Sequence, residues 1–538
     1  MQDIYYNGKI ITMEETNGDM ARANMPEAVL VDKGRIRFVG EFSKAKEMLH
    51  KGRVQYHDLA GKCLLPSFVD SHSHFVLNGQ MGLCVDLSEC TSFDDIVSDL
   101  KRYIEKNHIT NKYAVLGFGY DHNFLMEQKH PDRDVLDRVS KTIPIFILHV
   151  SAHMGCANSI ALQMAGISEA MKDPKGGHIG RRDGSNEPSG YLEEAAVGKV
   201  QAVVGKRIRK NIKAVIDKMQ KTYLEQGITT VQDGATTAAD FQFLRILGKL
   251  RILKMDVVAY PLMPSGGVAL MKKYGKKYAD YRKHVKIGGY KLVLDGSPQG
   301  KTAWLSEPYT ESNDYCGYAW LSDKEVEKYI TCAVREEKQI LAHCNGDAAS
   351  QQFLDIYEKV IKQLEPSKQL RPVMIHCQTV REDQLVRMAQ IPMIASIFVG
   401  HIWYWGEVHK KNLGLQRGNH ISPARSAISK GVRINFHQDT PVTKPNMLHS
   451  VWCAVNRLGR NGQTIGEDER ISVYEALKAI TIDAAYEYFE EDEKGSIKAG
   501  KRADLVILDK SPLEVAPLEL KNIKVLKTIK DGKCLLKR

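Results

Sequence analysis

Short apolar runs rich in β-branched residues recur along the middle of the chain, and helical periodicity follows them. Runs of about four to eight apolar residues between turn residues are typical of buried strands. Eight such runs occur, at residues 64–72, 227–232, 254–260, 285–294, 339–343, 372–376, 392–398 and 431–437. Eight strands alternating with helices can close a parallel barrel. We therefore predict an α/β fold, a (β/α)8 TIM barrel spanning residues 64–490.

Both ends of the chain show a different pattern, in which short strand-like runs are joined by tight turns. Asn7-Gly8 separates the runs 4–6 and 9–13, and Asp531-Gly532 follows the run 523–530. Such pairs are preferred in two-residue hairpin turns. We predict one hairpin at residues 4–13 and another at 28–39, across the turn 32–34, with a similar pattern at the C-terminal end, and a small β-sandwich assembled from residues 1–63 and 491–538.

A long segment, about residues 76–221, separates the first two predicted barrel strands. It contains two further strand-like runs, 113–120 and 143–150, and a glycine-rich loop at 176–190. Loops that follow barrel strands lie on the face that carries the active site in barrel enzymes. The segment is therefore predicted to form a lid or a substrate pocket.

Composition narrows the classes of partner. The formal net charge of +11 over 538 residues is scattered, and the densest basic cluster, 206–210, has no interleaved aromatic residues. A nucleic-acid partner is therefore not expected. No apolar run is long enough to span a bilayer, so we expect no membrane partner. The ten cysteines have no CxxC spacing and the start of the chain lacks a signal-peptide pattern, which favours reduced thiols and a cytoplasmic location.

Candidate chemistry begins with His72 and His74, at the end of the first predicted barrel strand. Residues two apart on a strand share a face, so both imidazoles can converge on one zinc-type ion. The alternative is a pair of solvated histidines in a polar turn. Further polar residues fall at or near the ends of other predicted strands: Lys291, His343, His376 and Asp439. Barrel enzymes hold their chemistry at these ends, so the set predicts one active site.

The chain resembles the amidohydrolase superfamily, in the family 3 branch that includes YtcJ-like proteins and N-substituted formamide deformylase. The resemblance extends over nearly the whole chain and is carried by residues 58–62, 190–196, 295–297, 301–303, 343–347, 401–406, 437–442 and 494–505. One departure is Ser67, where the family commonly has glycine. The resemblance implies a metal-dependent hydrolase with a small-molecule substrate, and a homodimer.

The resemblance also implies a ligand set. His72 and His74 would hold one divalent metal, zinc, and His343 and His376 a second, giving one or two ions per subunit. Lys291 matches a lysine that is carboxylated and bridges two ions, and Glu194 is the alternative bridging ligand. The alternative for Lys291 is an ammonium group paired with Asp295 or with a substrate anion.

Metal-bound water has a pKa of about 7, which supplies hydroxide at neutral pH. Asp439 would accept the water proton and deliver it to the departing amine, with His376 also in the catalytic set. The alternative for Asp439 is a hydrogen-bonding turn residue before Pro441. Predicted substrate-facing residues lie in loops, where lid packing is the alternative: Tyr120, Asp121, His153, Asn158, Trp304, His401 and Trp405.

The sequence thus predicts hydrolysis of a C–N bond other than a peptide bond, in an N-substituted formamide or a small N-acyl compound. Alternatives at the same site are cyclic amide, imide or lactone hydrolysis, and deamination. An alternative of another class is a catalytically silent regulatory or binding protein. A silent descendant is expected to lose metal ligands, and the expected ligand set is complete in this sequence.

Overall fold

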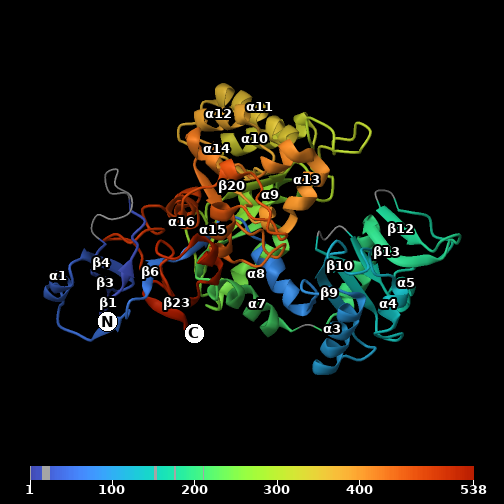
Figure 1. Cartoon of the computed structure of the whole chain (residues 1–538), viewed down its shortest axis with the longest axis horizontal. Coiled ribbons are helices and arrows are strands. Elements are labelled where there is room, and N and C mark those ends of the chain that lie inside the picture. Colours follow the sequence, from blue (N-terminus) through green and yellow to red (C-terminus); the bar gives the residue numbers. More distant parts are fainter. Residues whose placement is uncertain (1, 15–24, 151–153, 175–176, 210, 538) are drawn as a thin grey trace. The chain divides into compact units, whose positions relative to one another are not determined.

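The computed structural model describes residues 2–14, 25–150, 154–174, 177–209 and 211–537. The chain divides into two compact units (Figure 1). We call Met1–Val76 with Gln220–Arg538 the main unit, and Leu77–Met219 the insertion unit. Helices α2 (Phe75–Gln80) and α7 (Ile212–Leu224) contain the two boundaries.

Parallel strands alternate with helices through most of the main unit. One sheet has the order β16-β15-β14-β7, with strands Val285–Ile287, Asp256–Pro261, Ile228–Thr236 and Phe68–Asp70. The other has the order β17-β18-β19-β20-β21, with strands Gly289–Val293, Gln339–Cys344, Val373–His376, Ile394–Ile397 and Ile434–Phe436. Both ladders are parallel throughout. The strands follow the order expected for a TIM-type barrel, but within the described residues their ladders form two sheets rather than one closed cylinder.

Isolated contacts connect the two parallel sheets. Leu262, just after β15, forms a parallel bridge with Lys291 of β17. At the other seam, Ser71 Oγ donates to the carbonyl of Phe436 (2.9 Å) and the Asp439 N–H donates to the carbonyl of His72 (3.2 Å). One apolar cluster contains side chains of β7, β15, β18, β19 and β20, namely Val69, Val258, Tyr260, Leu341, Val373, Ile375 and Ile394. The two sheets therefore share a core.

Helices follow most of these strands. They are α8 (Ala238–Lys249), α9 (Gly267–Tyr274), α10 (Asp323–Arg335), α11 (Asp347–Leu364), α12 (Glu382–Gln390), α13 (His401–Asn419), α14 (Ala424–Ser429), α15 (Met447–Asn456), α16 (Val473–Ala479) and α17 (Ile482–Glu487). Some of their starts carry capping signals. For example, Thr237 caps α8 in a reciprocal pair with Asp240.

The predicted strand 64–72 is instead two strands in two sheets. β6 (Cys63–Pro66) pairs with β22 (Leu505–Leu508), whereas β7 pairs with β14. The chain changes sheets at Ser67, whose N–H donates to the Asp504 carbonyl (2.9 Å) and whose hydroxyl bonds Thr229 (2.6 Å). His72 and His74 therefore follow the end of β7 instead of lying within a strand.

The predicted strand 285–294 is also divided, at Gly288. The Gly288 N–H donates to the Ala259 carbonyl at 3.0 Å. A Cβ atom at this position would lie 2.4 Å from the ring of Tyr260. Glycine is thus required by the close approach of the aromatic ring, and the backbone changes partners there.

The terminal segments form two further sheets. One has the order β4-β3-β1-β5 (Arg35–Gly40, Ala28–Asp32, Gln2–Tyr6 and Val54–Asp58), beside helix α1 (Phe42–Glu47). The other has the order β2-β6-β22-β23-β24, where β2 is Lys9–Ile10, β23 is Val525–Lys530 and β24 is Lys533–Lys537. Side chains of both sheets share one apolar cluster, which includes Tyr5, Val29, Leu64, Leu505 and Ile529. In Figure 1 the blue β1 lies near the N-terminal end and the red β23 near the C-terminal end, and β24 is the last strand of the chain.

One of the two predicted hairpins is wrong. β1 pairs with β3 and β5, while β2 pairs with β6, so Asn7-Gly8 carries the chain from one sheet to the other. The Lys9 N–H donates to the Lys62 carbonyl at 2.9 Å, a partner far along the sequence. The second predicted hairpin is present, since β3 and β4 pair in antiparallel fashion, and β23 and β24 also do so around Asp531-Gly532.

The insertion unit is built on a six-stranded sheet of order β12-β13-β11-β10-β9-β8. These strands are Gly177–Arg181, Pro188–Glu194, Met154–Ala157, Ile145–His149, Val115–Tyr120 and Val85–Asp86. Its helices are α3 (Phe93–Lys106), α4 (Arg133–Asp137), α5 (Ser159–Met164) and α6 (Ala195–Arg207). Alternate residues of β10 enter two apolar clusters, one containing Ile145 and Ile147 and the other Phe146 and Leu148, so both faces of the sheet are covered.

Of the helices in the described residues, none has the length and apolar content needed to cross a membrane.

Candidate metal centre

Histidines from several strand ends gather around Asp439 in the main unit. His72 and His74 follow β7, His376 is the last residue of β19, and Asp439 follows β21. Asp439 Oδ1 lies 3.2 Å from His74 Nε2 and 3.4 Å from His72 Nε2, and its Oδ2 lies 3.9 Å from His376 Nε2. The ring of His343, from β18, is centred 4.4 Å from that of His376. Four strand ends therefore contribute to one cluster.

Hydrogen bonds on the far side of three rings orient the imidazoles. Nδ1 of His74 donates to the carbonyl of Gly234 at 2.8 Å. Nδ1 of His72 donates to Oε1 of Gln232 at 2.6 Å, and Nδ1 of His343 lies 3.1 Å from Oδ1 of Asp295. A ring that donates through Nδ1 presents the lone pair of Nε2, which is the arrangement of metal-binding histidines.

The three closest donors fit a divalent ion. Ligands held about 2.1 Å from a common ion lie about 3.0–3.4 Å apart in octahedral or tetrahedral geometry. The separations of 3.2 and 3.4 Å between Asp439 Oδ1 and the two Nε2 atoms match that spacing. Asp439 Oδ1 is also a buried acceptor without a hydrogen-bond donor among the residues described. A cation would satisfy the carboxylate and both imidazoles together.

The protonation of these groups depends on burial. Burial lowers the pKa values of His72 and His376 well below the usual range, so both rings are neutral near pH 7, as ligation requires. Burial also acts on His74, but the neighbouring Asp439 carboxylate outweighs it and raises the pKa of His74. A proton therefore competes with a cation at His74 Nε2.

Lys291 lies in β17 and is almost fully buried, at 1% exposure. Burial lowers the pKa of Lys291 to about 8, although the Asp439 carboxylate opposes the shift. Its Nζ atom has no hydrogen-bond partner in the described part of the chain. Asp295, the alternative partner, is occupied elsewhere: it accepts from the backbone N–H groups of Trp304, Asn345 and Gly346. The ammonium pair between Lys291 and Asp295 is therefore not formed.

Aromatic residues lie beside the histidines. His401, at the start of α13, stacks on His376 with ring centres 6.1 Å apart and lies 4.2 Å from Phe398. Trp405 packs edge-on against His401 at 5.3 Å, and both residues are buried. Trp304 lies half-buried in the loop that follows β17. These three residues, predicted to face the substrate, thus belong to the unit that contains the histidine cluster.

The remaining predicted residues belong to the insertion unit. His153 lies outside the described residues. Asn158 is fully buried and caps α5: its Oδ1 accepts from Ile145 and Ala161, and its Nδ2 donates to two carbonyls. These internal bonds argue against a substrate-binding role for Asn158. Glu194 ends β13, and its bridging role stays a prediction.

Tyr120 is the last residue of β9, and Asp121 follows it. Tyr120 is buried in an apolar cluster of the insertion, with its hydroxyl 3.0 Å from His130 Nδ1 and 3.4 Å from Cys156 Sγ. This environment favours packing over substrate contact. Asp121 lies beside His122 and His149.

Sequence reasoning missed several supporting residues. Gln232 Nε2 donates to the Ser71 carbonyl (2.6 Å) and to Glu487 (3.1 Å). These two bonds orient the amide so that its Oε1 atom faces His72. Glu487 reaches Asn435 at 2.7 Å, and burial raises the pKa of Glu487 to about 8. His437 is fully buried, with its ring centre 5.1 Å from those of His72 and His376. Gln232 and Asn435 could have been singled out in the sequence, because each is a polar residue inside an apolar strand run.

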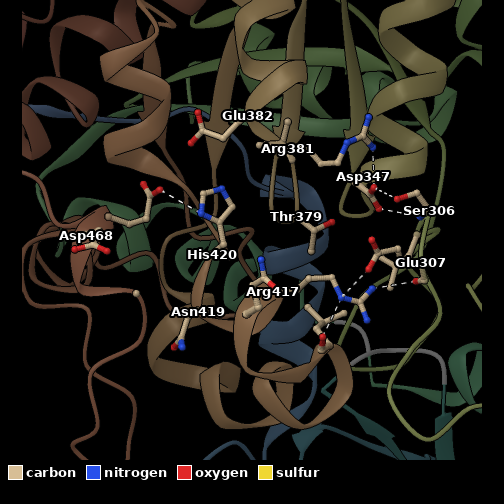
Figure 2. Close-up of a pocket in the computed structure, with 16 residues that line it drawn as sticks. Ser306, Glu307, Asp347, Thr379, Arg381, Glu382, Arg417, Asn419, His420 and Asp468 are labelled. Atoms are coloured by element: carbon tan, nitrogen blue, oxygen red, sulfur yellow. Dashed lines mark hydrogen bonds and ion pairs between the residues drawn. The ribbon is translucent and has the colours of Figure 1, made fainter.

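A cavity of about 520 Å³ lies in the main unit, and none of the predicted site residues lines it. Figure 2 shows Arg381 bonded to Asp347 (2.8 Å) and His420 directed toward an acidic group, Glu469, at 3.5 Å. Arg417 donates to the backbone carbonyls of residues 307 and 308. The basic groups of this cavity are therefore already paired with acceptors of the same unit.

Comparison with known proteins agrees with this geometry. The chain is 29% identical over 530 residues to N-substituted formamide deformylase of Arthrobacter pascens, covering 95% of each chain. It is 27% identical over 557 residues to the putative amidohydrolase YtcJ of Bacillus subtilis, covering 100% of each. An uncharacterized metal-dependent hydrolase of Pyrococcus horikoshii superposes with a TM-score of 0.76 at 22% identity, over 96% of this chain and 99% of that chain.

These matches indicate a TIM-barrel-type α/β fold. The family model described as "Amidohydrolase family" matches residues 55–536. The match includes every strand of both parallel sheets and every residue of the histidine cluster. The chain belongs to the amidohydrolase family.

Proposed function

We propose that this protein is a metal-dependent hydrolase that cleaves the C–N bond of an N-substituted formamide or a small N-acyl compound. The observation that carries the proposal is the convergence of His72 Nε2 and His74 Nε2 on Asp439 Oδ1, within 3.4 Å. The formamide class is supported by the 29% identity to a deformylase.

We propose His72, His74, His343, His376, Lys291 and Asp439 as the metal ligands, for one or two zinc ions. A divalent ion in this position lowers the pKa of water and polarises a carbonyl group. Asp439 then accepts the water proton through a carboxylate oxygen and passes it to the departing amine. His376, neutral because it is buried, faces Oδ2 of Asp439 and completes the catalytic set. His401, Trp405 and Trp304 supply an aromatic wall for the substituent on nitrogen.

We propose that Lys291 is carboxylated. Carbamate formation requires a neutral amine, and burial lowers the pKa of Lys291 to about 8, which leaves a neutral fraction near pH 7. Its Nζ lacks a hydrogen-bond partner among the described side chains. Glu194 remains the alternative bridging ligand.

We also propose the domain boundaries that the sequence predicts. The two parallel sheets would form one barrel over residues 64–490, with an insertion at about 76–221. The two terminal sheets would form a β-sandwich from residues 1–63 and 491–538, because their side chains share one core. The homodimer and the cytoplasmic location stay predictions.

A hydrolysis screen tests the function. Zinc-loaded protein is offered N-alkyl and N-aryl formamides, N-acetyl amines, cyclic imides, lactones and aminopurines, and the released amine, formate, acetate or ammonia, or the ring-opened acid, is measured. We expect turnover of formamides or N-acyl amines. Turnover confined to the cyclic compounds or the aminopurines would replace the proposal by one of its alternatives. Absence of turnover on every class by the metal-loaded protein would favour a silent regulatory protein.

A further inference from the structure

Three side chains of types that can bind metals lie together in the insertion unit, at the carboxyl ends of two neighbouring strands. Asp121 and His122 follow directly after β9, and His149 is the last residue of the neighbouring parallel strand β10. The register shifts between Leu148 and His149, so that His149 pairs with Tyr120. The Val150 N–H then bonds the Tyr120 carbonyl at 2.9 Å. This irregularity brings the carboxyl ends of β9 and β10 together. α/β proteins commonly bind ligands beside the carboxyl ends of parallel strands.

The donor atoms have the spacing of a coordination sphere. His122 Nδ1 lies 3.2 Å from His149 Nε2, and Asp121 Oδ1 lies 3.5 Å from His149 Nε2 and 3.8 Å from His122 Nδ1. Ligands about 2.1 Å from one ion are about 3.0–3.4 Å apart, so small shifts of Asp121 complete the fit. We propose that Asp121, His122 and His149 form a divalent transition-metal site in the insertion, separate from the histidine cluster of the main unit.

Neighbouring groups hold these side chains in place. Asn123 donates to Asp121 Oδ1 through its backbone N–H (3.0 Å) and its side-chain amide (2.9 Å). The ring of His130 stacks on that of His122 with centres 4.1 Å apart, and His130 Nδ1 is 3.0 Å from the Tyr120 hydroxyl. Such secondary contacts orient ligands at metal sites.

The donor set selects a class of metal. Two imidazole nitrogens and one carboxylate oxygen suit zinc, cobalt, nickel or ferrous iron, whereas calcium and magnesium prefer all-oxygen sites. Three protein ligands leave further positions open to water or to a small ligand. The competing explanation is a metal-free contact, in which His122 donates a hydrogen bond to His149 across the 3.2 Å separation.

The experiment uses the full chain with both proposed ion positions of the main-unit cluster disabled by His72→Ala, His74→Ala, His343→Ala and His376→Ala. Cobalt(II) is added, and bound cobalt is measured by elemental analysis and by d–d absorption of the ion. We expect one cobalt ion to remain bound per chain in this background. Addition of His122→Gln, or of His149→Gln, should weaken cobalt binding at least ~10-fold.

Controls separate the site from nonspecific binding and from misfolding. His178, an exposed insertion histidine paired with Asp173 at 2.8 Å, is the matched control, and His178→Gln should leave cobalt binding unchanged. Asp121→Asn, which preserves shape, should also weaken binding while the thermal unfolding midpoint is maintained. Absence of bound cobalt in the parent background, or equal binding by the His122 and His178 variants, would overturn the proposal. Neither result would bear on the function proposed for the main unit.

Discussion

Nε2 of His74 lies 3.2 Å from Oδ1 of Asp439, which joins the residues that follow the first and last parallel strands, β7 and β21. The contact brings together a nitrogen donor and an oxygen donor from residues that are far apart in the sequence. Because Asp439 also approaches His72 and His376, three imidazoles share its carboxylate.

Asp439→Asn should abolish most turnover. The amide keeps the shape of the carboxylate but cannot accept the water proton, so we expect kcat to fall about 10²- to 10⁴-fold. The histidines remain, so most of the bound metal should be retained. Initial rates on the best formamide substrate and elemental analysis of the same samples check both parts. Wild-type turnover by this variant would remove Asp439 from the catalytic role.

Gln232→Leu should weaken metal binding without removing a ligand. The substitution deletes the acceptor of the His72 Nδ1–H, 2.6 Å away, so the ring loses its fixed tautomer and orientation. Loss of such secondary contacts typically lowers metal affinity about 10- to 100-fold. Competition with a fluorescent zinc chelator measures the change. Gln232→Glu, which restores an acceptor, should recover part of the affinity, and equal affinity in all three proteins would refute the role.

Carboxylation of Lys291 can be observed directly. Protein exchanged with ¹³C-labelled bicarbonate should show a carbamate signal by ¹³C NMR, since the buried amine has a lowered pKa. Lys291→Arg should lose this signal, because a guanidinium group stays protonated. A wild-type spectrum without a carbamate signal, in metal-loaded protein under bicarbonate, would leave Glu194 as the bridging candidate.

Asp256→Asn should destabilise the main unit. Asp256 is buried in β15 and contacts Lys494 (2.8 Å) and Lys530 (2.9 Å). Removing the carboxylate takes one acidic partner from each of two buried ammonium groups, while Lys494 keeps Glu490 and Lys530 keeps Asp504, so we expect a loss of about 1–3 kcal/mol. Urea unfolding at pH 7 measures it. Asp531→Asn, 3.5 Å from the same Lys530 but partly exposed, is the control and should change the free energy of unfolding by less than about 1 kcal/mol.

The same carboxyl predicts a pH dependence. Burial opposes ionisation of Asp256, but Lys494 and Lys530 outweigh it and hold the pKa well below the usual range. The folded state therefore gains stability from Asp256 above its unfolded pKa of about 3.9, and loses that gain as the pH falls toward the folded value. Asp256→Asn should flatten the loss of stability below about pH 4. Identical acid profiles for the two proteins would contradict this account.

The strand order could be predicted because most of the parallel strands are compact apolar runs followed by a helix. Partner choice could not always be predicted, because it depends on distant backbone. Asn7-Gly8 has the sequence of a hairpin turn, yet Lys9 bonds Lys62 instead. Likewise Pro66 and Ser67 lie in one apolar run, although the chain changes sheets between β6 and β7.

The proximity of His72 and His74 was predictable from their two-residue spacing at a strand end. The supporting residues were not, because their partners come from other strands. Gln232 is one polar position in an apolar run, and only the tertiary structure shows that it meets His72. Asn158 illustrates the opposite error, since a polar residue in a loop motif serves as a buried helix cap.

Metal content and activity, measured together on purified protein, test the central claim most directly. The wild type should contain at least one zinc-type ion, lose amide hydrolysis on chelation and regain it with zinc or manganese. His72→Ala with His74→Ala should lack hydrolysis under every metal condition. Full hydrolysis by the chelated wild type, or by this double variant, would contradict the account.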